Sequence, residues 1–416
     1  MDCFKKSAVE SCDEKEYQKL KHCAFDFWAE HMNEGLNLYK NESLRLTAYK
    51  CLVETRTIRR ETSDRQLCPK RQLCPEMTCT LNPYDQRFVD WDYIYNLKDE
   101  TKIGDQFSQD LWHLYDTQSL HFKDIARKSW IRRDLSQCLT TSFAYDNFVD
   151  IFITGSTVNG FGTRDSDLDL CLVVSEFCPL EEMRKSDKLA ILSEVEDIVC
   201  RQLEVEESQV IDARVPILRY IHPKTRIQVE INVNNEIGLK NSRLLYCYSK
   251  LDWRVAPICI AIKLWAKHFE IINSFSGSLS SYCVELMAIF YLQNTSPPLV
   301  PCLQETDSGL FGVRAEMWDY LELPDLKQLK STSFATANEE SLSELFAGFF
   351  RFYVQVFDFN RHVASVRLGR ILEKQHFVSQ MDSMQWQYIC VEEPFSGHNA
   401  ARTLYNPVAY DIRRIV

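Results

Sequence analysis

The sequence predicts an α+β fold, in which a mixed sheet backed by helices is followed by a mainly helical region. Residues 227–233 alternate apolar and polar side chains, as a half-buried strand requires. Residues 148–153 and 168–174 form two further apolar, strand-like runs. Residues 180–205 lie between two of these strands and carry apolar side chains at helical spacing, so helices are expected to cover the sheet.

The chain has 416 residues, of which 45 % are hydrophobic, and this is enough for two or three domains with full cores. Its net charge of −11 excludes a surface that attracts nucleic acid as a whole. A polyanion must therefore be held in a local basic groove or through a metal ion. No apolar run approaches about 18 residues and the N-terminus lacks an apolar signal segment, so neither a membrane span nor a signal peptide is expected.

Residues 1–100 are expected to form a Cys-rich, helical extension whose role stays open. A helix is expected over residues 14–39. Seven of the 16 cysteines lie within the first 79 residues. Three interpretations stand side by side: a Cys/His metal site, a disulfide-stapled domain of secreted type, and a helical extension or appended fragment. The metal site would draw on Cys12, His22, Cys23 or His31.

Two helices are expected before the sheet, one near residues 107–115 with Asp105 as its cap and one over 118–139. The second helix carries five basic residues between its apolar positions: Lys123, Arg127, Lys128, Arg132 and Arg133. A run of charges on a helix is usually a solvated face, and a role in holding RNA is the alternative.

The strand that begins after Asp167 carries the candidate site. Asp167 and Asp169 are two residues apart and therefore lie on one face of the strand. Two carboxylates this close repel each other unless a cation lies between them, and Mg²⁺ prefers such oxygen ligands. Upstream, Gly155 and Ser156 form a turn whose backbone N–H groups can approach a phosphate closely. On the alternating strand 227–233, Glu230 is the candidate for a third carboxylate.

The Gly-Ser turn, the Asp-x-Asp strand and the acidic strand that leads into Asn-Val-Asn-Asn resemble the DNA-polymerase-β-like nucleotidyltransferase superfamily. Within it, the chain is similar to the cytoplasmic poly(A) polymerases and terminal uridylyltransferases. Further matches are Asn-Gly-Phe-Gly-Thr-Arg at 159–164, Ile-Lys-Leu-Trp-Ala-Lys at 262–267, Leu-Ser-Ser-Tyr at 279–282 and Val-Glu-Glu-Pro-Phe at 391–395. The resemblance covers residues 105–416 and does not cover residues 1–100.

The resemblance implies a nucleotidyltransferase palm at residues 141–240, a mixed sheet with helices. A mainly helical central domain at 241–416 would carry the poly(A)-polymerase-associated region. Helices within residues 101–140 are expected to belong to the central domain. The aromatic run from Phe349 to Phe359 is expected to be core packing rather than a platform for stacking bases.

The resemblance also implies template-independent addition of AMP or UMP to an RNA 3′ end, with two Mg²⁺ or Mn²⁺ ions. The implied metal ligands and catalytic residues are Asp167, Asp169 and Glu230. The implied nucleotide-binding residues are Gly155, Ser156, Asn241, Lys263, Lys267, Ser281, Tyr282 and His398. By resemblance, Asn241 reads the ribose 2′-hydroxyl and the two lysines hold the triphosphate. The Ser281 hydroxyl suits a phosphate oxygen, and the ring of Tyr282 can stack on the base.

The family normally has aspartate where this chain has Glu230. One extra methylene displaces the carboxylate by more than the roughly 0.5 Å that such sites tolerate. An active enzyme is expected, and a weakened or inactive relative that binds RNA or protein as a scaffold is the alternative.

The choice of nucleotide depends on His398. His398 directly precedes Asn399. In the uridylyltransferase branch a histidine directly before the corresponding asparagine faces the base, and an imidazole N–H can donate to uracil O4. The remaining motifs are closer to the adenylating branch, so UTP and ATP both stay open, with a slight preference for UTP. No separate RNA-recognition motif is evident, so an RNA-binding partner protein is expected to select the RNA. The expected location is the cytoplasm, with the nucleus as the alternative.

Overall fold

The computed structural model describes residues 105–404 except for 144–147, 175–182, 206, 273–276, 313–319, 379–385, 387, 403 and several positions between 322 and 333. The helix expected at 14–39 and the three interpretations of the Cys-rich segment lie outside the described residues. Within the described residues, every helix is too short or too polar to cross a bilayer.

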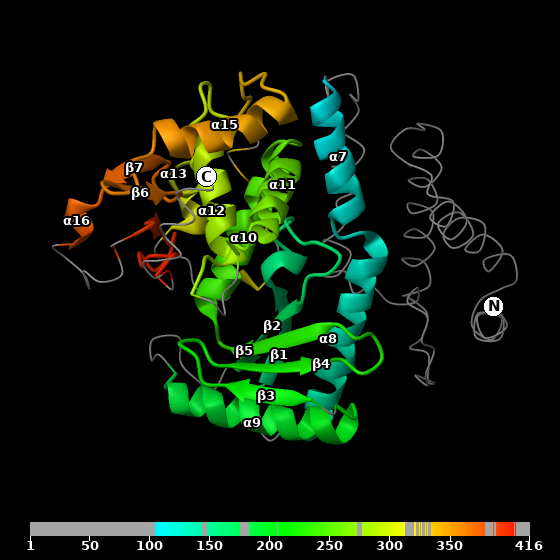
Figure 1. Ribbon diagram of the computed structural model, residues 1–416. Coiled ribbons are helices and arrows are strands. Elements are labelled where there is room, and N and C mark those ends of the chain that lie inside the picture. Colours follow the sequence, from blue (N-terminus) through cyan, green and yellow to red (C-terminus); the bar gives the residue numbers. More distant parts are fainter. Residues whose placement is uncertain are drawn as a thin grey trace, which may run out of the picture. The chain divides into compact units, whose positions relative to one another are not determined.

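A five-stranded mixed sheet forms the lower half of the view in Figure 1. Its strands are β1 Phe148–Thr154, β2 Leu168–Val174, β3 Ser208–Ile211, β4 Ile217–Ile221 and β5 Gln228–Val233. Their order in the sheet is β1-β2-β5-β4-β3. β2 and β5 pair in parallel, and the other neighbours pair antiparallel. The strands expected from periodicity are confirmed, whereas β3 and β4 were not expected.

Two long helices pack on this sheet. α8, Phe122–Ser142, contacts β1, and α9, Lys185–Gln202, contacts β3, β4 and β5. Their apolar stripes are fully buried, as Leu135 on α8 and Val195 on α9 show. The helix expected over 180–205 is confirmed in a shorter form, and α8 begins later and ends later than expected.

The other half is mainly helical. Its main helices are α7 Gln106–Gln118, α10 Glu236–Leu251, α11 Val255–His268, α12 Ser281–Gln293 and α15 Leu342–Gln355. The short helices are α13 Leu303–Thr306, α14 Ser308–Phe311 and α16 Gln375–Val378. A small sheet, ordered β7-β6-β8, joins β6 His362–Ser365, β7 Arg370–Glu373 and β8 Val391–Glu392. This second sheet was not expected.

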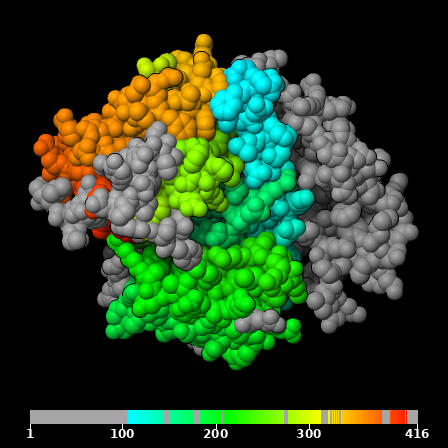
Figure 2. Space-filling model, viewed as in Figure 1, coloured from blue at the N-terminus to red at the C-terminus, as the bar shows by residue number. Residues whose placement is uncertain are grey.

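The segment before the five-stranded sheet connects both halves. α7 packs against α11 and α15, and α7 and α15 lie next to each other at the surface shown in Figure 2. α8 instead packs against β1 and α9. The two helices of this segment therefore contact different halves. The domain boundaries expected from the sequence stay predictions.

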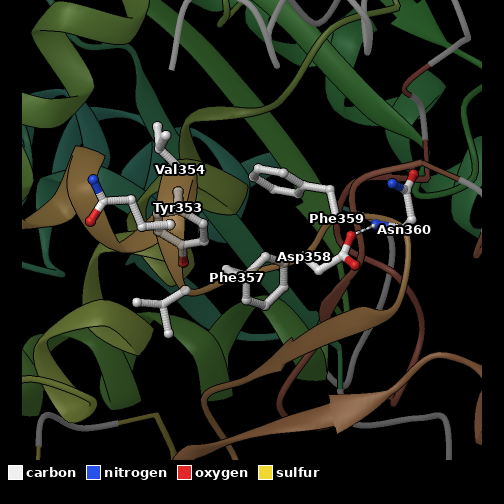
Figure 3. A pocket seen from close by; sticks show the side chains of 8 residues that line it. Tyr353, Val354, Phe357, Asp358, Phe359 and Asn360 are labelled. Carbon is white, nitrogen blue, oxygen red and sulfur yellow. Dashed lines mark hydrogen bonds between the residues drawn. The ribbon is translucent and has the colours of Figure 1, made fainter.

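The aromatic run at the end of α15 is core packing, as expected. Phe349, Phe352, Tyr353 and Phe357 are each less than 9 % exposed, and their rings contact one another mostly edge to face. A surface pocket of about 340 Å³ opens beside the residues that follow, from Tyr353 to Asn360 (Figure 3). None of these residues belongs to the expected site.

The basic residues of α8 do not form one solvated face. Lys128 is 1 % exposed and Arg132 is 6 % exposed, whereas Lys123 and Arg133 are exposed. The guanidinium of Arg132 donates to the carbonyl of Ile151 at 2.9 Å and forms an ion pair with Asp150 at 3.3 Å. The expectation of a solvated face is therefore wrong for Lys128 and Arg132. The cause is their position, since both lie beside the apolar stripe that packs on the sheet.

Replacing Arg132 by methionine should destabilise the protein, because the Ile151 carbonyl loses a donor and Asp150 loses its cation. We expect the free energy of unfolding of Arg132→Met to fall by about 1–3 kcal/mol. Lys123→Met, on the exposed side of the same helix, should change it by less than about 0.5 kcal/mol. Urea denaturation of both variants measures the difference, and equal midpoints would contradict the assigned role of Arg132.

Candidate active site

Three carboxylates meet near the beginning of two adjacent strands. Asp169 is the second residue of β2, and Asp167 directly precedes the strand. In the parallel pairing of β2 with β5, Glu230 lies directly opposite Asp169. The sheet therefore brings together the three acidic residues that the sequence predicts.

The electrostatics of Asp169 reflect this convergence. Its pKa is raised to about 7, first by burial and then by the negative charges of Asp167 and Glu230, while Lys128 and Lys263 oppose the shift. A group of like charges held this close is favourable only when positive charge compensates it. The donor chemistry of the two aspartates thus suits a hard divalent cation.

Glu230 is partly committed to protein partners. Its Oε1 accepts from Arg219 Nε at 2.8 Å and from Gln228 Nε2 at 3.1 Å. The same Gln228 amide also donates to Asp167 Oδ2 at 3.3 Å. Among the described residues, no group of three or more His, Cys, Asp or Glu side chains is arranged as a finished metal site. The Asp167–Asp169 pair fits a metal ion, and Glu230 keeps its second oxygen outside these bonds.

The turn that follows β1 lies against Asp169 and leaves no room for a side chain at Gly155. Gly155 has a φ of +63°, and a Cβ at this position would lie 2.1 Å from Asp169 Oδ2. Its N–H donates to Ser242 Oγ at 2.8 Å, which ties the turn to α10. Only glycine fits both the positive φ and the close contact. Ser156 follows in the 3-10 turn Gly155–Thr157 and is half-buried.

Lys128 is a site residue that the sequence analysis missed. Its Nζ donates to Thr157 Oγ1 at 3.2 Å, to Ser166 Oγ at 2.8 Å and to the Asp167 carbonyl at 3.0 Å. Burial lowers the pKa of Lys128 to about 8, and the charges of Asp169 and Asp167 oppose this. One ammonium from α8 therefore holds the Gly-Ser turn and the start of the Asp-x-Asp strand together. The available signal was its spacing from Ile131 and Leu135, which places it beside the buried stripe.

The two lysines of α11 differ in their surroundings. Lys263 is 2 % exposed, and its Nζ donates to Glu285 Oε1 at 2.8 Å and to the Phe161 carbonyl at 3.0 Å. Lys267 is exposed and makes no ion pair within the described part of the chain. Partial burial lowers the pKa of Lys267, as does Lys263, while Asp167 raises it. Lys267 thus has a charge available to a ligand, whereas Lys263 is already engaged.

Glu393 connects the residues that would meet the sugar and the base. Its Oε1 accepts from Asn241 Nδ2 at 2.8 Å and from the Tyr282 hydroxyl at 3.1 Å. Its Oε2 accepts from the backbone N–H of Phe395 at 3.1 Å. The carbonyl oxygen of Asn241 is buried and has no hydrogen-bond partner. Glu393 leaves that acceptor free for a ligand hydroxyl, and the sequence pattern around Glu393 does not indicate this role.

Ser281 and His398 complete the expected set. Ser281 is the first residue of α12, as expected, and Ser280 is the N-cap, accepting from the Cys283 N–H at 3.2 Å. His398 lies on the same turn as Glu393, whose N–H donates to the His398 carbonyl at 2.8 Å. Burial lowers the pKa of His398, Arg214 and Arg402 lower it further, and Glu393 opposes them. Its Nδ1 is buried without a hydrogen-bond partner, so the imidazole has a nitrogen available to a ligand.

Comparisons with known proteins agree with this arrangement. Residues 107–250 match a family described as poly(A) RNA polymerase, mitochondrial-like, central palm domain, and residues 341–399 match the Cid1 family poly A polymerase. The poly(A) RNA polymerase GLD2 of Rattus norvegicus is 34 % identical over 313 residues, which are 74 % of this chain and 62 % of GLD2. The Homo sapiens protein has the same identity and coverage. The chain thus spans 62 % of the length of these curated relatives.

Solved structures with a similar fold include the following two. One is a GLD-2/RNP-8 complex, with a TM-score of 0.60, 28 % identity and coverage of 74 % of this chain and 90 % of that one. The other is the Cid1 poly(U) polymerase, with a TM-score of 0.60, 25 % identity and coverage of 74 % and 91 %.

The five-stranded sheet with its paired aspartates is a nucleotidyltransferase palm. Over 74 % of its length the chain is similar to the family of poly(A) polymerases and terminal uridylyltransferases. Members of this family generally use divalent metal ions.

The close contact at Gly155 gives a direct test of the site. Gly155→Ala should displace the Asp169 carboxylate, because the added Cβ would clash with it, and weaken Mn²⁺ binding about 10- to 100-fold, as disturbing the surroundings of a metal ligand does. Gly309→Ala is the matched control, because nothing lies within 4 Å of a Cβ there. Electron paramagnetic resonance titration of free Mn²⁺ measures both variants. Equal affinity in Gly155→Ala and wild type would refute the proposed ion site.

Proposed function

We propose that the protein is a template-independent nucleotidyltransferase that adds AMP or UMP to RNA 3′ ends. The observation that carries this proposal is the convergence of Asp167, Asp169 and Glu230 beside the Gly155 turn. The carboxylates can bind divalent metal ions, and the backbone of the turn can bind phosphate. The similarity to curated poly(A) RNA polymerases and to the Cid1 poly(U) polymerase supports RNA as the acceptor.

Each part of the site has a role in this reaction. Two Mg²⁺ or Mn²⁺ ions at Asp167, Asp169 and Glu230 would activate the 3′-hydroxyl and stabilise the leaving pyrophosphate. Ser156 and the backbone of its turn would contact the triphosphate. Lys267 would supply an exposed positive charge, and it interacts electrostatically with Asp167. Lys128 holds the turn next to the start of the Asp-x-Asp strand by hydrogen bonds to both segments.

The sugar and base would lie at Asn241, Tyr282 and His398. The unpartnered Asn241 oxygen can accept a hydrogen bond from a ribose hydroxyl, because its amide nitrogen is already fixed by Glu393. The hydroxyl of Tyr282 is also fixed by Glu393, which sets the orientation of its ring for stacking. Ser281, one residue earlier on α12, is available to a phosphate oxygen.

The nucleotide preference has support in both directions. The curated relatives are poly(A) RNA polymerases, which favours ATP. The free Nδ1 of His398 favours UTP, because a protonated ring nitrogen can donate to uracil O4, where adenine presents an amino group. We propose that His398 moves the preference towards UTP.

A partner protein would select the RNA. One of the similar solved structures is a complex of GLD-2 with RNP-8, and we propose that this chain also works with an RNA-binding partner. We further propose that it acts in the cytoplasm.

RNA extension by the purified protein tests the proposal. With a labelled RNA oligomer, Mg²⁺ or Mn²⁺ and each NTP in turn, we expect tails with ATP or UTP. Asp167→Ala should lower the rate by at least about a thousandfold, because it removes a proposed metal ligand and the negative charge that helps to hold the metal ions. Extension by Asp167→Ala at the wild-type rate would refute the assigned site.

Glu230 supports a second candidate function, a weakened enzyme that serves as a binding scaffold. The observation is the Arg219 bond to Glu230 Oε1, which competes with a metal ion for that carboxylate. If the wild type extends no RNA with any NTP, but Glu230→Asp does, the enzyme function is wrong for this chain and Glu230 is the cause. Binding of the labelled RNA by the inactive wild type would then support the scaffold function.

His398→Ala tests the nucleotide preference. In a mixture of ATP and UTP, the wild type should add more uridine than the variant, by about 2- to 10-fold, as expected for one hydrogen bond to a base. Sequencing of the tails gives the ratio. An unchanged ratio would remove His398 from nucleotide selection.

A further inference from the structure

A buried network joins the palm to the helical half beside the candidate active site. Glu285 on α12 is 3 % exposed, and its two carboxylate oxygens have different partners. Oε1 accepts from Lys263 Nζ of α11 at 2.8 Å, and Oε2 accepts from Asn159 Nδ2 of the palm at 3.1 Å. One carboxylate thus binds a cation from one half and an amide from the other.

Both partners of Glu285 hold the same backbone residue. Lys263 Nζ donates to the carbonyl of Phe161 at 3.0 Å, and Asn159 Oδ1 accepts from the Phe161 N–H at 2.8 Å. The loop of residues 159–161 is therefore fixed at both backbone polar groups of Phe161. This loop lies in the sequence between the Gly155 turn and Asp167, the two segments that carry the site.

We propose that Glu285 is a positioning residue that holds Lys263 and the loop 159–161 in one arrangement beside the nucleotide site. The proposal rests on the proposed function, since the loop matters to nucleotide transfer. It goes beyond that function in giving Glu285 a role and in making Lys263 a support of the loop.

Burial and hydrogen bonding favour positioning over a charge effect on the ligand. Lys263 and Glu285 are each at most 3 % exposed, so their charges are matched to each other rather than presented to solvent. Two of the three Lys263 donors are already used within the protein. Lys267, one turn later on the same helix, is exposed and is the lysine with a charge to offer a triphosphate.

The donor and acceptor pattern permits a test by exchange. In Glu285→Gln, the new amide N–H₂ must face either Asn159 Nδ2 or Lys263 Nζ, and both are donors. In Asn159→Asp, two carboxylates face each other. In the double variant, the amide introduced at position 285 donates to the carboxylate introduced at position 159. The net charge is then that of the wild type, and every donor has an acceptor again.

We expect each single variant to lower kcat/KM for the NTP about a hundredfold, as a misplacement of about 1 Å can do. The double variant should return to within about threefold of the wild type. Glu305→Gln, an exposed carboxylate on α13, is the matched control and should leave kcat/KM unchanged. Thermal midpoints of all four variants correct the rates for the fraction of folded protein.

Three results would overturn the proposal. One is opposite signs, in which Glu285→Gln binds the NTP more tightly and Asn159→Asp more weakly, since only a charge effect predicts that. Another is a double variant no better than the worse single variant. The third is a loss of rate in the single variants that the fraction of folded protein explains completely.

Binding of a non-hydrolysable NTP separates this proposal from the proposed function. If the wild type extends no RNA, the proposed function fails. The role of Glu285 is then decided by binding alone: the single variants should bind at least about tenfold more weakly, and the double variant should recover. Equal binding by all variants, or no binding by the wild type, would refute the role of Glu285.

Discussion

The structure of the site depends on the repulsion among three carboxylates held at adjacent strand positions. Strand pairing places Asp169 directly opposite Glu230, and the period of two places Asp167 on the same face. Two protein cations offset this repulsion. Lys128 from α8 donates to the Asp167 carbonyl, and Arg219 from β4 forms an ion pair with Glu230. Without them, three negative charges would have to remain close in a partly buried site, which is unfavourable.

The three carboxylates do not share the compensating partners evenly, and the least compensated carboxylate is where a cation can bind. Glu230 has the Arg219 guanidinium, and Asp167 has the Gln228 amide and the Lys128 bond to its carbonyl. Asp169 accepts no hydrogen bond from the other described side chains, and its burial together with the charges of Asp167 and Glu230 raises its pKa. The approach of Gly155 then leaves no room for a side chain on that side of Asp169. Positive charge supplied from outside would therefore act most strongly at Asp169.

Local patterns predicted the elements that carry the acidic residues, and long-range contacts decided the rest. The alternation in residues 227–233 is a local signal, and it predicts β5 and places Glu230 on the same polar face as Gln228. Lys128 was assigned to a solvated face because charge runs usually are, and only the packing of α8 on β1 shows otherwise. Glu393 and Glu285 act on partners 152 and 126 residues away, so no sequence window contains both ends of either contact. Short strands such as β3 also escape prediction, because four residues give too little periodicity.

The glutamate at position 230 follows from its two cross-strand neighbours. Antiparallel pairing places Arg219 directly opposite it on β4, and parallel pairing places Asp169 opposite it on β2. Attraction on one side and repulsion on the other turn the carboxylate towards Arg219, and the longer stem of glutamate allows the 2.8 Å contact. The side chain of an aspartate at position 230 would be one methylene shorter and would reach less far towards the Arg219 guanidinium. The extra methylene thus exchanges part of the metal-binding capacity of this carboxylate for an ion pair within the sheet. The capacity that remains depends on Oε2, which has no protein partner among the described residues.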